Sequence, residues 1–196
     1  MATRQAVYDD SHPYVAQVKT ILAQILLSQG KIHKAERLLK SALKSFERVI
    51  GDSAPSVAST LVTLGNISSS KRKFTEAEEQ LKRAKAIIDE ASGPNSFSSV
   101  GVFSAMGRVY LGRGLWPEAA EQFERAIKIT ESMFGPDHPE VAKGRCYLAL
   151  VYARHMRYTD AITTLRQNLP TLQRWLGVDD PEVQQFTEVL HKLTKH

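Results

Sequence analysis

Apolar residues recur along the chain at spacings of three and four, which is the period of an amphipathic helix. The clearest row begins with an alanine, continues with a large apolar residue four positions later, and returns to a small residue after three more. This row occurs in full three times, at Ala35, Leu39 and Ala42, at Ala77, Leu81 and Ala84, and at Ala119, Phe123 and Ala126, and a fourth time at Ala161 and Leu165, where Asn168 breaks the series. It predicts four helices that begin near Ile32, Phe74, Trp116 and Tyr158, each named helix B below.

A second helical pattern precedes each of these rows, and we name the corresponding helix A. Its predicted core positions are Val15, Leu22, Ala23 and Leu26, then Val57, Leu61, Leu64 and Gly65, then Val100, Phe103, Met106, Gly107 and Tyr110, then Val141, Leu148, Ala149 and Tyr152. A small residue recurs at Ala23, Gly65, Gly107 and Ala149, which allows two helix backbones to approach closely. A last stretch, with Val183, Phe186, Val189, Leu190 and Leu193 on one side, predicts a capping helix.

A short junction separates the units and repeats every 42 residues, with Pro13, Pro55, Pro139 and Pro181 in register and Phe97 in the remaining place. Proline is tolerated in the first turn of a helix, where its missing N–H has no partner to lose. The residues two positions earlier, Ser11, Ser53, Asn95, Asp137 and Asp179, are therefore predicted N-caps, with Glu140 and Glu182 completing a capping box in the last two. Gly51, Gly93, Gly135 and Gly177 are the expected left-handed residues at the ends of the B helices.

A repeat of this length predicts an all-α solenoid of helix–turn–helix units, in which each unit buries its apolar face only against its neighbours. The units are residues 11–52, 53–94, 95–136 and 137–178, followed by the capping helix 179–196. Residues 1–10 are either an N-terminal tail or the end of a preceding unit. The third unit is where we expect flexing, because Gly101, Gly107 and Gly112 weaken its first helix and Phe97 replaces the proline. Pro170 predicts a kink or break in the last B helix.

Composition narrows the possible functions. The chain has 196 residues, 42% of them hydrophobic, with 26 basic and 21 acidic residues interleaved to a net charge of +5. No apolar run approaches the length of a membrane span, and the first residues lack secretory character, so a cytoplasmic protein is the default expectation. The single cysteine, Cys146, excludes an internal disulfide and suggests a structural thiol.

The small residue Gly107 followed by Tyr110 in helix A, with Ala119, Phe123 and Ala126 in helix B, resembles the tetratricopeptide repeat. The 42-residue length and the junction from Gly135 to Ala142 are similar to the kinesin light chain subtype. This resemblance implies a right-handed superhelix whose A helices line a concave groove for an extended or helical segment of another protein. Kinesin light chain repeats carry asparagine at inner positions of helix A, where this chain has Thr20, Val62, Ser104 and Cys146.

The groove stripe can be placed on the A helices at spacings of three and four. Its candidate partner-binding residues are Gln17, Thr20 and Gln24, then Ser59, Val62, Asn66 and Ser69, then Ser104, Arg108 and Leu111, then Lys143, Cys146, Leu150 and Arg154. The first half is small and polar and the second half is basic. Arg108, Lys143 and Arg154 could together bind an acidic segment. The alternative is that these three side chains are solvated and point away from one another.

These patterns favour a non-enzymatic interaction scaffold that binds a segment of another protein. One alternative is a permanent structural subunit of a large complex. Another is an RNA-contacting protein that uses the basic row of the first B helix. This row comprises Lys31, Lys34, Arg37, Lys40, Lys44 and Arg48. The same row is also typical of a solvated helix face. We expect no catalytic group, metal, cofactor, small-molecule substrate or membrane insertion, and nucleic acid is not the expected partner.

Overall fold

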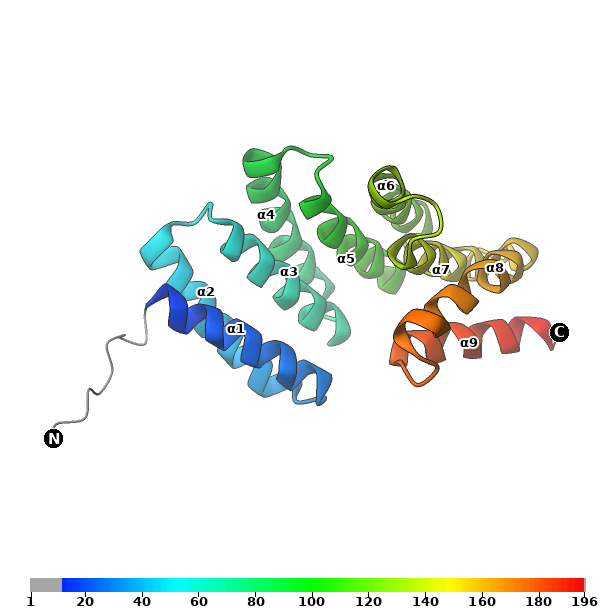
Figure 1. Ribbon diagram of the computed structural model, residues 1–196, viewed down its shortest axis with the longest axis horizontal. Helices are drawn as coiled ribbons and strands as arrows, with labels where there is room; N and C mark the ends of the chain where they lie inside the picture. The colour runs from blue at the N-terminus through cyan, green and yellow to red at the C-terminus, as the bar shows by residue number, and fades with distance from the viewer. Residues whose placement is uncertain (1–11, 196) are drawn as a thin grey trace, which may run out of the picture. The chain divides into compact units, whose positions relative to one another are not determined.

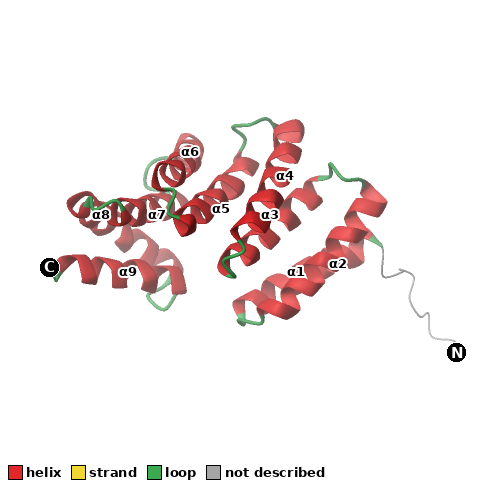
Figure 2. Ribbon diagram, turned by 180° about the vertical axis from the view of Figure 1, so that it is seen from behind, coloured by secondary structure: helices red, strands yellow, loops and turns green. Residues whose placement is uncertain are grey.

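The computed structural model describes residues 12–195, and these residues form helices joined by short turns, with no strand among them (Figures 1 and 2). The A helices are α1 (Pro13–Ser28), α3 (Pro55–Ser70), α5 (Phe97–Arg113) and α7 (Pro139–Arg154). The B helices are α2 (Ile32–Ile50), α4 (Phe74–Ser92), α6 (Trp116–Phe134) and α8 (Tyr158–Leu176), and α9 (Pro181–Thr194) follows. The predicted starts of the B helices are therefore confirmed. The prediction for residues 1–10 lies outside the described residues.

The chain divides into two compact units, the first ending at Pro94 and the second beginning at Asn95. In the first unit α1 packs on α2, α2 on α3, and α3 on α4. In the second unit α5 packs on α6, α6 on α7, α7 on α8, and α8 and α7 both on α9 (Figure 1). The division falls just before the junction in which Phe97 replaces proline, the place where the sequence predicts flexing.

Close approach of two helices was predicted at the recurring small residues, and at Gly65 and Gly107 the structure shows that the neighbour is helix B of the same repeat. A Cβ atom added to Gly107 would lie 2.7 Å from the ring of Phe123, and one added to Gly65 would lie 2.8 Å from Leu81. Real Cβ atoms do not approach so closely, so a side chain at either position would separate the two helices. The alanine and leucine row of the B helices is buried as predicted, from Ala35 and Leu39 in α2 to Leu165 in α8.

The helices begin one residue later than the predicted caps require. The N-caps are His12, Ala54, Ser96, His138 and Asp180. Three of them bond the first turn through their side chains: His12 Nδ1 accepts the Tyr14 N–H at 3.2 Å, His138 Nδ1 accepts the Glu140 N–H at 3.2 Å, and Asp180 accepts two N–H groups. The predictions for Ser53, Asn95, Asp137 and Asp179 are wrong, and Ser11 is not described. In four of these five helices proline occupies the first helical position, where its fixed φ suits the helix, so the cap is the residue directly before it.

The glycines that end the B helices have positive φ as predicted, but they are not in the left-handed helical conformation. Gly135, for example, has φ 85° and ψ 167°, and Gly51, Gly93 and Gly177 are similar. This region is essentially restricted to glycine and turns the chain into the extended junction. Between helix A and helix B, Arg72 and Met156 adopt φ 60° at turns where the other two repeats have Gly30 and Gly114.

Helix α8 continues through Pro170 from Tyr158 to Leu176, so of the predicted kink or break the break is wrong, and the kink stays a prediction. Proline removes one intrahelical bond there. Two residues earlier, the buried side chain of Asn168 donates to the carbonyl of Thr164 at 2.8 Å. This hydrogen bond gives the buried Asn168 amide a partner within α8. It explains how asparagine fits at a position that is alanine in the other three repeats.

Candidate partner-binding surfaces

In the first unit the predicted stripe is accessible on both A helices. Gln17 and Gln24 of α1 and Ser59 of α3 are exposed, and Thr20, Val62, Asn66 and Ser69 are partly exposed. Two of the hydroxyls bond their own helix, since Thr20 donates to the Ala16 carbonyl at 3.0 Å and Ser59 to the Ser56 carbonyl at 3.1 Å. The stripe of this unit is therefore uncharged and built from short side chains.

In the second unit the stripe is accessible on α5 and only at the two ends of α7. Ser104, Arg108 and Leu111 are partly exposed, as is Lys143, and Arg154 is exposed. Cys146 and Leu150 are buried and leave the candidate surface. The reason is that the middle of α7 is enclosed by α5, α6, α8 and α9. Burial raises the pKa of the Cys146 thiol to about 12, so it stays protonated, which fits a structural role.

The three basic residues of the second unit have different surroundings. The Lys143 ammonium pairs with the Glu140 carboxylate at 2.8 Å, which neutralises it. The Arg108 guanidinium lies over the ring of Tyr147, 5.5 Å from the centroid. Arg154 lies in the last turn of α7. Lys143 is therefore less suited to bind an acidic partner than its position on the stripe suggests.

Tyr147 connects three helices of the second unit and was not among the predicted residues. Its buried ring stacks on Phe123 at 5.3 Å and meets Phe186 edge-on at 5.1 Å, and its hydroxyl donates to the Glu182 carboxylate of α9. Burial raises the pKa of Tyr147 above its usual range, and the Arg108 charge acts in the opposite direction. The buried Tyr147 ring thus contacts a positive group on α5, Arg108, and its hydroxyl bonds a negative group on α9, Glu182.

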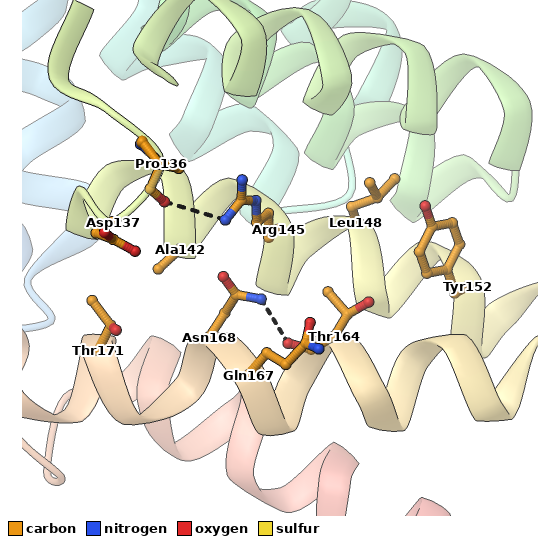
Figure 3. A pocket seen from close by; sticks show the side chains of 10 residues that line it. All are labelled: Pro136, Asp137, Ala142, Arg145, Leu148, Tyr152, Thr164, Gln167, Asn168 and Thr171. Atoms are coloured by element: carbon orange, nitrogen blue, oxygen red, sulfur yellow. Dashed lines mark hydrogen bonds between the residues drawn. The ribbon is translucent and has the colours of Figure 1, made fainter. Parts of the chain in front are cut away.

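A pocket of about 440 Å³ lies between the junction before α7, α7 itself and α8 (Figure 3). Arg145 spans one side of it, donating to the Pro136 carbonyl at 3.2 Å and to Glu131 at 3.0 Å. Gln167, Asn168 and Thr164 of α8 form the opposite side. Sequence reasoning did not identify this pocket, although the replacement of alanine by Asn168 was its one visible sign.

The basic row of the first B helix is partly neutralised. Glu36 pairs with Lys40 at 2.8 Å and also with Lys71, from the end of α3. Hydrogen bonds from these two lysines lower the Glu36 pKa from 4.5 to about 2. The remaining members Lys31, Lys34, Arg37, Lys44 and Arg48 are exposed.

Two classes of site find no support in the part of the chain that the structure describes. No group of three or more His, Cys, Asp or Glu side chains there could hold a metal ion. No helix in residues 12–195 is long and apolar enough to cross a membrane. His12 and His138 serve as helix caps instead, and the ring of His138 stacks on Phe134 at 4.6 Å.

A family model described as tetratricopeptide repeat matches residues 14–90, 56–132 and 99–174, so that the matches overlap and together cover most of the chain. The chain belongs to the tetratricopeptide repeat family. Tetratricopeptide repeats generally mediate protein–protein interaction, and proteins of this fold are typically non-enzymatic scaffolds. No curated protein sequence matches the chain.

Solved structures support the same fold. The nearly identical TPR-like repeats of a Podosopora anserina kinesin light chain protein superpose with a TM-score of 0.71 at 20% identity, over 94% of this chain and 87% of that one. BtubC (BKLC) from P. vanneervenii gives a TM-score of 0.71 at 20% identity, over 89% of this chain and 69% of that one. At this identity the similarity establishes the repeat fold, with kinesin light chain-like repeats among its neighbours.

Proposed function

We propose that this chain is a non-enzymatic adaptor that binds a segment of another protein on the exposed stripes of its A helices. The family membership supports a protein partner. The observation that carries the proposal is made in each unit separately: α3 in the first unit and α5 in the second each leave a line of residues partly exposed, while most of their other residues are buried. The proposed contacts comprise Ser59, Val62, Asn66 and Ser69 on α3 and Ser104, Arg108 and Leu111 on α5.

On the second unit we assign the main contact to Arg108. Its guanidinium rests on the Tyr147 ring, a contact worth roughly 1 kcal/mol that restricts the side chain before a partner arrives. A planar guanidinium can bond two oxygens of one carboxylate. Because Lys143 is already paired with Glu140, the favoured partner carries one acidic residue opposite Arg108 rather than an acidic run.

On the first unit the α3 stripe is uncharged. Asn66 can both donate to and accept from a peptide backbone, and the short side chains of Ser59 and Ser69 leave room for the partner's main chain. This surface is suited to an extended segment, which exposes its backbone groups, more than to a helix, whose backbone groups are already bonded.

Affinity purification combined with crosslinking mass spectrometry tests the assignment. We expect partner crosslinks on α3 and α5, and we expect Arg108→Glu, alone and with Lys143→Glu, to reduce capture of the crosslinked partner about tenfold or more, the loss expected when a charge pair is reversed. Lys128→Glu is the matched control, because Lys128 is exposed on α6. Undiminished capture by the Arg108→Glu, Lys143→Glu variant would remove the stripe of the second unit from the proposal.

A second candidate function is a permanent structural subunit of a larger assembly. It is favoured by an exposed apolar edge in the second unit, formed by Phe97, Met133 and Phe134, which are 48%, 55% and 47% exposed. Exposed apolar clusters often mark surfaces that are covered by another protein. The size of the native protein in a cell extract distinguishes the two functions, since a free pool at monomer size contradicts permanent residence.

A further inference from the structure

Helix α1 carries a line of large apolar side chains on its surface. Tyr14, Val18, Ile21, Leu22 and Ile25 are between 45% and 64% exposed, and we name these five residues the α1 face. Their spacing of four, three, one and three places them on one side of the helix. Leu22 was predicted to lie in the core, and that prediction is wrong.

The same positions are covered in the later repeats. The residues that follow Val18, Leu22 and Ile25 by 42 positions are Thr60, Leu64 and Ile67 of α3, and these are at most 4% exposed because α2 packs on α3. In α7 the corresponding face includes Leu148 and Val151, which are buried where α6 packs. The face is therefore shaped to receive a helix, and on α1 it lies open to solvent.

The α1 face is also free of charge. Lys19 is the one charged residue of α1, and its ammonium donates to the Ser41 hydroxyl of α2 at 3.0 Å. The whole chain has a net charge of +5, which opposes association of two copies in general. At an uncharged apolar face this repulsion is least and the gain from burying apolar surface is greatest.

We propose that the α1 face binds the α1 face of a second copy of this chain, with the two helices antiparallel about a two-fold axis. A face that binds itself needs no other matching surface on the molecule. Stacking of α1 on the exposed residues of α9 is disfavoured, because these are polar and include Gln184, Gln185, Glu188 and Lys192. In the antiparallel pair Tyr14 lies opposite Ile25, and Val18 lies opposite Ile21 and Leu22.

The size of the face sets the expected affinity. A 16-residue helix is about 24 Å long, and five half-exposed side chains offer on the order of 500 Å² per copy. Stable dimers usually bury about 800 Å² per copy. We therefore expect a reversible dimer that dissociates at micromolar concentration.

Sedimentation equilibrium of the full chain over a wide concentration range tests this proposal. The mass should rise from that of the 21.9 kDa monomer to twice that value. Val18→Glu with Ile25→Glu should keep the protein monomeric, because four glutamates would meet in each dimer, and Val49→Glu on α2 should leave the dimer intact. Far-UV circular dichroism checks that each variant keeps its helices. A wild-type protein that stays monomeric, or a dimer that survives the double substitution, overturns the proposal.

Cysteine crosslinking tests the register, since the native Cys146 is buried. A mixture of Val18→Cys and Ile21→Cys proteins should yield dimers joined between the two positions, and Val49→Cys should not. A synthetic peptide of α2, Ile32–Ile50, tests the other possible occupant of the α1 face, which is a B helix of a repeat. If this peptide binds the α1 face of a protein that does not dimerise, the face accepts a repeat helix and the second-copy proposal is wrong.

Discussion

The rings of Phe97 and Phe134 meet edge to face, with their centroids 5.3 Å apart, at the junction where phenylalanine replaces proline. Phe134 also stacks on His138, which caps α7. The aromatic contacts thus join the start of α5, the end of α6 and the start of α7. Phe97 replaces the conformational restriction of proline with a side-chain contact inside the second unit.

A double-mutant cycle of Phe97→Ala and Phe134→Ala should show that this contact is stabilising. Edge-to-face pairs contribute about 1 kcal/mol beyond their burial. The stability losses of the two single variants should therefore add up to about that much more than the loss in the double variant. Urea denaturation measures the four free energies of unfolding. Strictly additive losses would show that the rings do not stabilise each other.

Replacement of two glycines of α5 by alanine should change the stability of the protein in opposite directions. A Cβ at Gly107 would meet the Phe123 ring at 2.7 Å, so Gly107→Ala should destabilise the protein by about 2 kcal/mol. A Cβ at Gly101 meets nothing within 4 Å, and Gly101→Ala should stabilise it by up to about 1 kcal/mol through helix propensity. Thermal unfolding of the two variants provides the comparison, and equal shifts would contradict the close approach of α5 and α6 at Gly107.

The cap of α9 distinguishes two adjacent aspartates. Asp180 accepts the N–H groups of Glu182 and Val183 at 2.9 and 3.2 Å, whereas Asp179 is exposed before the cap. Asp180→Ala should cost about 1 kcal/mol and Asp179→Ala much less. Hydrogen exchange of the α9 amides would report the loss locally. A larger effect at Asp179 would support the cap position that the sequence pattern predicted.

Stability should depend on pH through Glu36. Its folded pKa of about 2 lies below the ordinary 4.5, so its ionised form stabilises the fold. This contribution is fully present above pH 4.5 and is lost as the pH falls towards 2. Glu36→Gln should lower the free energy of unfolding by about 1 kcal/mol at neutral pH, because an exposed or partly exposed ion pair contributes at most about that much to stability.

The difference between Glu36→Gln and the wild type should shrink as the pH falls from 4.5 to 2, as measured by denaturant unfolding at each pH. Glu90→Gln is the matched control, because Glu90 is exposed on α4. A difference that stays constant across this range would contradict the pairing of Glu36 with Lys40 and Lys71.

Much of the fold could be predicted because its signals are local. The alanine and leucine row, the turn positions and the prolines placed the helices, and the predicted starts of the B helices at Ile32 and Phe74 agree with the structure. The caps were assigned one residue too early, because Asp137 and His138 can both accept an N–H bond and composition favours the aspartate. The geometry of the first turn selects His138.

The sequence by itself determined the repeat, the helices and the small positions where two helices approach closely, because each depends on residues within one unit. Only the tertiary structure decided which helix faces remain exposed. Cys146 and Leu150 are buried because four helices enclose the middle of α7, and Leu22 is exposed although its repeat position is apolar. Exposure depends on how many neighbours a helix has, and a repeating sequence pattern does not carry that information.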